Sequence, residues 1–204
     1  MRLALRTLFS VKGRAYITPT NAAMTTTAYE TDLRYPVGKF NWDVPVSEAE
    51  YPKLIAQIAE TPGALRSAVA GLSAEQLETP YRPGGWKVKQ LVHHVPDSHL
   101  NAYTRFKLAL TEDKPTIKPY DQAAWAELPD SQKVPIDVSL ALLESLHVRW
   151  VALLRSMDAA DFGRQLRHPE HDRVLTLGQM LGLYAWHGRH HVAHITALRK
   201  REGW

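Results

Sequence analysis

Trp186-His187-Gly188-Arg189-His190-His191-Val192-Ala193-His194 is a stretch near the C-terminus that places four histidines within eight residues. Its apolar neighbours recur at helical spacing. Residues four apart lie on one face of an α-helix, so His187 and His191 can hold one ion between them. His190 and His194 have the same spacing and form an alternative pair. The pattern predicts a metal site on this helix, completed by a ligand from another part of the chain.

A second histidine cluster, His93-His94 with His99, lies in a helix that we predict at about residues 86–110. Neighbouring residues on a helix point about 100° apart, so at most one of His93 and His94 can join a shared site. Pro96 interrupts the hydrogen bonding of this helix, which favours a kink or irregular local structure. The two histidine clusters can meet only if their helices face each other in one bundle.

The rest of the chain supplies two more long helical patterns. Ser47-Glu48-Ala49-Glu50 is a capping box that opens the first helix, and Thr61-Pro62-Gly63 leaves open one kinked helix or two short ones. A third helix is predicted from Asp137 to Met157, and the histidine-rich helix from Thr176 to about Arg201. Four long helices and almost no strand alternation predict an all-α protein, a four-helix bundle with long connecting loops.

The connections are predicted from their turn-forming residues and prolines. They comprise an extended lead-in at residues 24–46, a short turn after Ser73, a proline-rich connection at 111–136 with a short helix around Gln122–Glu127, and an irregular segment at 158–175 with an extended excursion near Arg164–Arg173.

The length of the chain predicts one domain, and its charges predict a domain with equal numbers of basic and acidic residues. The chain has 204 residues, of which 45% are hydrophobic, and no apolar run approaches the roughly 18 residues that span a bilayer. Four basic residues and no acidic ones precede Met24, and the remaining 21 basic residues equal the 21 acidic ones. A nucleic-acid partner is therefore not supported. We interpret residues 1–23 as a disordered or wrongly included extension, residues 24–204 as a single domain, and the protein as cytoplasmic without membrane association.

The absence of cysteine restricts the ligands of any metal to histidine and oxygen groups. Neutral imidazoles suit Zn²⁺, Ni²⁺, Co²⁺ or Fe²⁺. Three protein ligands with one open position are typical of a catalytic site rather than a structural one. From the residues alone, the third ligand is open between His93 and His94.

Four motifs resemble one known family. Gly85-Trp86 followed by His94 and Asp97-Ser98-His99 resembles the second-helix signature of the DinB-like superfamily, and Trp186 to Ile195 resembles its fourth-helix signature. Arg34-Tyr35-Pro36-Val37-Gly38 and Pro115-Thr116-Ile117-Lys118-Pro119-Tyr120 are similar to the YfiT branch. The resemblance covers roughly Leu33 to Trp204. Pro96 departs from the pattern, because the family more often has a residue compatible with a helix at this position near His94, and residues 1–23 have no counterpart.

The resemblance implies that the metal ligands are His94, His187 and His191. It further implies zinc or nickel as the ion, a homodimer, and one of two activities, because the branch is described as metal-dependent hydrolases and as bacillithiol S-transferases. We expect a divalent metal cofactor, and a small-molecule electrophile and a low-molecular-weight thiol as partners.

The open coordination position suggests how such a site works. A thiol held there loses its proton near neutral pH, and the resulting thiolate can attack an electrophile. Because the chain has no cysteine, the thiol must come from a separate low-molecular-weight compound. Water in the same position would have a pKa of about 7 and would hydrolyse a polar bond instead. We favour the S-transferase, with a hydrolase as the alternative and a non-catalytic metal- or ligand-binding bundle as the third reading.

Several other residues are candidates for supporting roles, each with an ordinary structural reading beside it. Asn101 and Arg105 follow His94 on one helix face and could address carboxylates of a thiol cofactor, although a solvated or ion-paired arginine is the simpler reading of Arg105. Tyr184 and Trp186 flank the site as cofactor contacts or as core aromatics.

The remaining candidates are histidines and one acid. We expect His190 and His194 to be satisfied imidazoles more readily than donors to the ligands. His147 and His168 could line the mouth of the site or be structural. Asp97 could orient a ligand imidazole or be a surface carboxylate.

Overall fold

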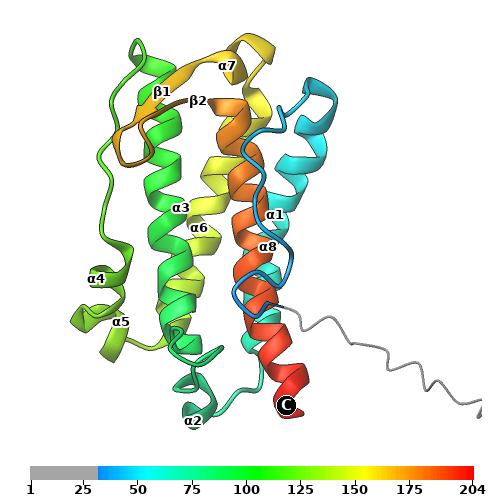
Figure 1. Ribbon diagram of the computed structural model, residues 1–204, viewed down its shortest axis with the longest axis vertical. Helices are drawn as coiled ribbons and strands as arrows, with labels where there is room; N and C mark the ends of the chain where they lie inside the picture. The colour runs from blue at the N-terminus through cyan, green and yellow to red at the C-terminus, as the bar shows by residue number, and fades with distance from the viewer. Residues whose placement is uncertain (1–31) are drawn as a thin grey trace, which may run out of the picture. The chain divides into compact units, whose positions relative to one another are not determined.

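Four long helices form the body of the protein in the computed structural model, which describes residues 32–204. They are α1 (Tyr51–Val69), α3 (Val88–Thr111), α6 (Ile136–Ser156) and α8 (Leu177–Glu202), and they run alongside one another (Figure 1). This confirms the predicted all-α four-helix bundle. The predicted extension at residues 1–23 lies outside the described residues.

The two prolines inside helices do not divide them. α1 continues through Pro62 and α3 continues through Pro96, so each is a single helix. The capping box at Ser47 forms as predicted, with the Ser47 amide donating to Glu50 Oε2 at 2.9 Å, and a short 3-10 turn, η1 (Glu48–Glu50), precedes α1. α3 begins at Val88, two residues later than predicted, because the Lys87 amide is capped by Gln90 Oε1 at 2.9 Å.

The connections contain more regular structure than the sequence indicated. α2 (Ala74–Leu77) and α4 (Gln122–Ala126) were expected, and α5 (Pro129–Lys133) was not. The prediction of an irregular segment at 158–175 was wrong for its first part, which contains α7 (Ala159–Gly163). The extended excursion predicted near Arg164–Arg173 corresponds to an antiparallel hairpin of β1 (Gln165–His168) and β2 (Arg173–Thr176). The hairpin covers the end of the bundle where α8 begins (Figure 1).

The interior consists of two apolar clusters. All four long helices contribute to both clusters, and three of these helices also carry most of the buried histidines. One cluster includes Phe106 and Trp150, and the other includes Leu91 and Leu143. On α6 and α8 the buried histidines fall where one cluster ends and the other begins. On α3 His99 does the same, and His93 and His94 lie one turn earlier, within the cluster of Leu91. The fold therefore holds a polar layer across the middle of an otherwise apolar bundle.

Residues 32–46, the described part of the predicted lead-in, pack along α8 (Figure 1). Trp186 Nε1 donates to the Gly38 carbonyl at 3.1 Å, and His194 Nε2 lies 3.1 Å from the Arg34 carbonyl. Gly38 has a φ of +78°, a conformation that favours glycine. These contacts bring the lead-in beside the histidine-rich part of α8.

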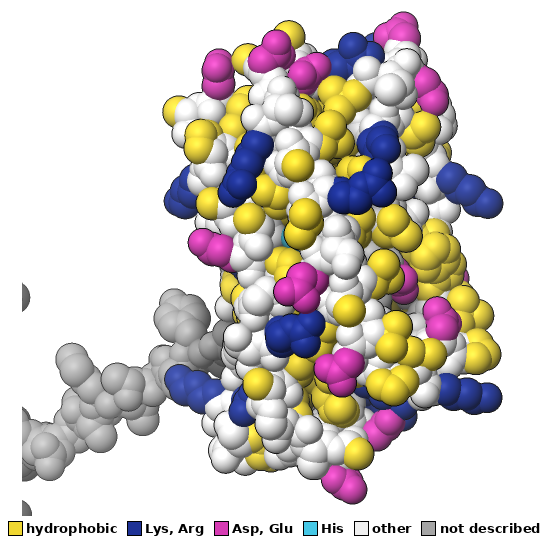
Figure 2. All heavy atoms as spheres, turned by 180° about the vertical axis from the view of Figure 1, so that it is seen from behind, with side chains coloured by type: hydrophobic (Ala, Val, Ile, Leu, Met, Phe, Trp, Pro, Cys, Tyr) yellow, Lys and Arg dark blue, Asp and Glu magenta, His cyan; other side chains and the backbone are white. Residues whose placement is uncertain are grey.

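The surface carries charges of both signs. On the face seen in Figure 2, basic and acidic side chains are interspersed among hydrophobic ones, and histidine is barely visible. Within residues 32–204, no helix combines the length and the apolarity that a bilayer crossing needs.

Candidate metal centre

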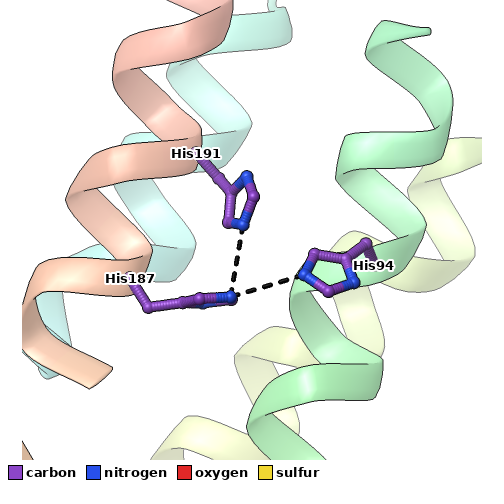
Figure 3. Close-up of side chains that lie close together, drawn as sticks. All are labelled: His94, His187 and His191. Atoms are coloured by element: carbon purple, nitrogen blue, oxygen red, sulfur yellow. Dashed lines mark hydrogen bonds between the residues drawn. The ribbon is translucent and has the colours of Figure 1, made fainter. Parts of the chain in front are cut away.

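Three imidazoles from two facing helices converge on one point. His187 and His191 project from adjacent turns of α8, and His94 projects toward them from α3 (Figure 3). His187 Nε2 lies 3.4 Å from His94 Nε2 and 3.2 Å from His191 Nε2. The structure thus brings together the three residues that the resemblance pointed to, and Pro96 does not prevent it.

The spacing of these nitrogens suits a divalent ion. With nitrogen ligands about 2.0–2.1 Å from a tetrahedral ion, neighbouring ligand atoms lie about 3.3 Å apart. The two measured separations, 3.4 Å and 3.2 Å, bracket that value. The donor set of three imidazoles is one that zinc and nickel accept.

Burial keeps these imidazoles uncharged. It lowers the pKa of His94 to about 4. The pKa values of His187 and His191 lie well below their ordinary value, because burial disfavours the charged ring and neighbouring histidines add to the effect. At neutral pH all three rings are therefore neutral, and each has one nitrogen with a lone pair for a metal.

Neighbouring side chains hold the ligand rings in place. The Trp86 ring packs against the His94 ring with centroids 4.8 Å apart. His187 uses its second nitrogen, Nδ1, in a 3.1 Å contact with His99 Nε2. Ser98 Oγ lies 3.5 Å from His187 Nε2, and Tyr120 lies near Ser98. Burial raises the pKa of Tyr120 to about 12, so its hydroxyl keeps its proton.

A cavity of about 360 Å³ adjoins the histidines. That volume lies in the range of small-molecule sites. His187 and His191 form part of its wall, which also has aromatic and polar members and one cation. These members include Tyr81, Arg82, Trp86, Gln122 and Trp186.

The predicted supporting residues lie elsewhere. Asn101 Nδ2 donates to the Asp97 carbonyl of its own helix at 2.9 Å. Arg105 is buried, not solvated, and its Nη2 donates to the Lys118 carbonyl at 3.3 Å. Tyr184 is buried with its ring edge-on to His99 at 5.3 Å. None of the three is among the residues that line the cavity.

The other candidate histidines are buried. His190 stacks on Trp186 with centroids 4.2 Å apart, and His194 lies against the Arg34 carbonyl, so both have the structural contacts that we expected. Their ring nitrogens also lie within 4.8 Å of one another and of His191, which makes a second possible metal group. His168 is buried as well.

Two supporting roles need correction. His147 was a candidate for the mouth of the site, but it is buried in the core. Its Nε2 lies 2.8 Å from His99 Nδ1. Asp97 was a candidate to orient a ligand imidazole, but the second nitrogen of His187 contacts His99, so Asp97 does not fill this place at His187. Burial and the nearby Asp130 instead raise the pKa of Asp97 to about 6.

Sequence reasoning also missed the side chains around the ligands. Arg82 and Tyr81 line the cavity just before the Gly85-Trp86 motif, and Ser98 and Tyr120 lie inside two of the motifs. Their place within or beside the motifs was the available signal. Nothing local in the sequence connects His99 with His147.

Comparisons with known proteins identify the family. The sequence model of the DinB superfamily matches residues 57–195. Proteins of Bacillus cereus and Bacillus thuringiensis, both named "Putative metal-dependent hydrolase", are 56% identical over 173 residues, covering 85% of this chain and 99% of theirs. The solved structure of YfiT from Bacillus subtilis, described as a probable metal-dependent hydrolase with an unusual four-helix bundle topology, is 49% identical with a TM-score of 0.82, covering 84% of this chain and 98% of that one. The chain belongs to the DinB superfamily and to its YfiT branch.

Proposed function

We propose that this chain is a metal-dependent enzyme whose divalent ion, zinc or nickel, is held by His94, His187 and His191. The convergence of three neutral imidazole nitrogens beside a cavity carries this proposal. The relatives named as metal-dependent hydrolases support a metal-dependent reaction. A divalent ion bound there supplies a Lewis acid that increases the acidity of a thiol or water.

For the reaction, we favour transfer of a low-molecular-weight thiol, such as bacillithiol, to a small electrophile. The thiol sulfur forms a bond to the electrophilic carbon, the leaving group departs with the electrons of the broken bond, and the thiol proton passes to solvent. The chain has no cysteine, so the sulfur comes from a second substrate. Hydrolysis, in which water takes the place of the thiol, is the second candidate and is favoured by the names of the relatives.

The residues around the cavity have parts in this reaction. Trp86 and Trp186 offer apolar surface to the electrophile, and the guanidinium of Arg82 offers a positive charge to a carboxylate of the thiol substrate. This assigns to Arg82 the role for which the sequence suggested Arg105. His94 and His191 are buried, and the low polarity around buried groups strengthens electrostatic interactions with them. We expect the protein to act as a cytoplasmic homodimer.

A product analysis tests the proposal. The protein is first analysed for bound metal, then incubated with chlorodinitrobenzene and with p-nitrophenyl acetate, each with and without bacillithiol, cysteine or coenzyme A. We expect a metal-dependent thioether product, identified by mass spectrometry, that forms only with a thiol. Metal-stripped protein and the His191→Ala variant are the controls.

The other outcomes separate the alternatives. Metal-dependent release of nitrophenol without any thiol would establish hydrolysis and overturn the transferase. A tightly held ion with no turnover in either assay would point to a non-catalytic binding protein. A folded protein that binds no divalent ion would overturn the proposal as a whole.

A further inference from the structure

A line of hydrogen bonds leads from the candidate metal ligands through all four long helices. It begins at His187 on α8 and passes to His99 on α3, at 3.1 Å between Nδ1 and Nε2. His99 Nδ1 then lies 2.8 Å from His147 Nε2 on α6, and His147 Nδ1 lies 2.8 Å from the Ile58 carbonyl oxygen on α1. Each imidazole uses both of its nitrogens, so its tautomer depends on its neighbours.

The Ile58 carbonyl fixes the direction of this line. A carbonyl oxygen can only accept, so the hydrogen in its contact with His147 must be on His147 Nδ1. The carbonyl is free for this role because the residue four positions along α1 is Pro62, which has no amide hydrogen to donate back. Pro62, which interrupts the sequence pattern of the first helix, therefore leaves the Ile58 carbonyl free to accept a hydrogen bond from His147.

The hydrogen on His147 Nδ1 determines the tautomers of His99 and His187. A neutral imidazole carries one hydrogen, so with Nδ1 protonated, His147 Nε2 accepts from His99 Nδ1. His99 Nε2 is then an acceptor and takes the hydrogen of His187 Nδ1. That leaves His187 Nε2 with a lone pair, and this is the atom that faces both His94 and His191.

The residues around His99 support this assignment of tautomers. His99 is fully buried, with the rings of Trp150 and Tyr184 edge-on to it at 5.6 Å and 5.3 Å. These rings restrict its rotation and keep out water that could substitute for a partner. His147 is buried as well, and burial disfavours the charged form of an imidazole. Both rings therefore stay neutral, as one donor and one acceptor each require.

We propose that His99 and His147 are positioning residues that hold His187 in the tautomer and ring orientation that present its Nε2 lone pair to the metal. This inference goes beyond the ligands themselves and rests on the metal site proposed above. Partners that orient a ligand imidazole typically contribute about 10- to 100-fold to metal affinity.

The tautomer of His187 gives a direct test that needs no metal. Protein labelled with ¹⁵N-histidine and treated with a chelator is examined by two-bond ¹H–¹⁵N NMR at neutral pH, with His187→Ala used to assign its signals. We expect the hydrogen of His187 on Nδ1, and the same for His99 and His147. A His187 ring with its hydrogen on Nε2 would overturn the proposal.

Metal affinity, measured by competition with a chromophoric chelator, gives the second test. We expect His99→Leu to weaken binding by about 10- to 100-fold, and His147→Leu to weaken it less because it acts one ring further away. His99→Gln should recover part of the loss, because an amide can donate and accept in the same chain. His93→Leu is the matched control, since His93 is also buried on α3 but contacts Ser139 at 2.7 Å instead of a ligand.

The two tests separate this inference from the proposed function. A folded His99→Leu variant with the metal affinity of the unaltered protein would overturn the positioning role. A loss in His93→Leu as large as in His99→Leu would do the same, because burial alone would then explain the effect. If the unaltered protein bound no divalent ion, the metal site would be wrong, and the NMR result would still decide the tautomer.

Discussion

Single imidazoles decide whether an ion can bind here, because three lone pairs must meet at one point. His94, His187 and His191 meet this condition through the approach of α3 to α8, and burial keeps each ring neutral. His190 and His93, each next to a ligand in sequence, point to other partners, namely Trp186 and Ser139. One residue along a helix is thus enough to separate a ligand from a structural histidine.

The ligand assignment predicts a contrast between neighbours. His187→Ala or His191→Ala should reduce metal affinity by more than about 100-fold, since losing a ligand costs more than losing its orienting partner. Helical content by circular dichroism should stay near that of the unaltered protein. His190→Ala is the control, and equilibrium dialysis against zinc followed by elemental analysis is the measurement. If His190→Ala emptied the site while His187→Ala left it filled, the assignment would be wrong.

At the level of single residues, the sequence indicated the candidate ligands but not the residues that surround them. The i, i+4 spacing indicated His187 and His191 directly, whereas the choice of His94 over His93 needed the family resemblance. His99 and His147 are 48 residues apart, and only packing of α3 against α6 brings them together. Because a distant contact leaves no local pattern, their role could not be predicted.

Among the elements, the close approach of α1 to α8 positions the ligand helix. A Cβ atom on Gly188 would lie 2.5 Å from Thr61 Oγ1 and 2.7 Å from Thr61 Cγ2. Glycine is therefore required beside His187 for α8 to approach α1 this closely. The same region of α1 supplies the Ile58 carbonyl that accepts from His147.

Filling this contact should destabilise the protein. We expect Gly188→Ala to reduce the free energy of unfolding by about 1–3 kcal/mol, the usual effect of overpacking, and to lower the thermal midpoint. The double variant Thr61→Ala with Gly188→Ala should regain much of the loss, because the two atoms nearest the new methyl group are removed. Urea unfolding monitored by circular dichroism measures both. Additive losses in the double variant would contradict the proposed clash.

The helices themselves were largely predictable, and the exceptions have physical reasons. Caps and apolar spacing placed α6 and α8 within one residue at each end, since the predicted spans were 137–157 and 176–201. α5 begins with Pro129, a residue type that marks loops as readily as the first turn of a helix. The strands of the hairpin have four residues each, too few for alternation to be distinguished from a loop.

For the whole molecule, the notable feature is the number of histidines removed from water. Eight of the ten are buried within the part of the chain that the structure describes. Burying a histidine in its neutral form lowers its pKa, and the unfolded chain then binds protons that the folded chain does not. Acid should therefore destabilise the fold at the same histidine layer that we propose as the metal site.

The buried histidines determine the sign and the size of this pH effect. Burial lowers the pKa of His94 and of His147 to about 4, against 6.5 for an ordinary histidine. Their contribution to stability is complete above about pH 6.5 and is lost as the pH falls toward 4. Two protons bound only by the unfolded chain correspond to about 3 kcal/mol per pH unit. Asp97, with its pKa raised to about 6, acts in the opposite direction and, being partly exposed, offsets less than one proton.

We therefore expect the metal-free protein to lose stability steeply between pH 6.5 and 4.5. Urea unfolding at half-unit pH intervals would measure it, and the slope of the unfolding free energy against pH gives the number of protons taken up. His147→Leu should reduce that slope by about one proton, because it removes one buried neutral ring. Zinc should raise the stability most near neutral pH, where the ligand nitrogens are free, and little near pH 4.5. If the unfolding free energy did not change over this pH range, the histidines would be open to water. Burial would then no longer explain why the rings stay neutral and available to an ion.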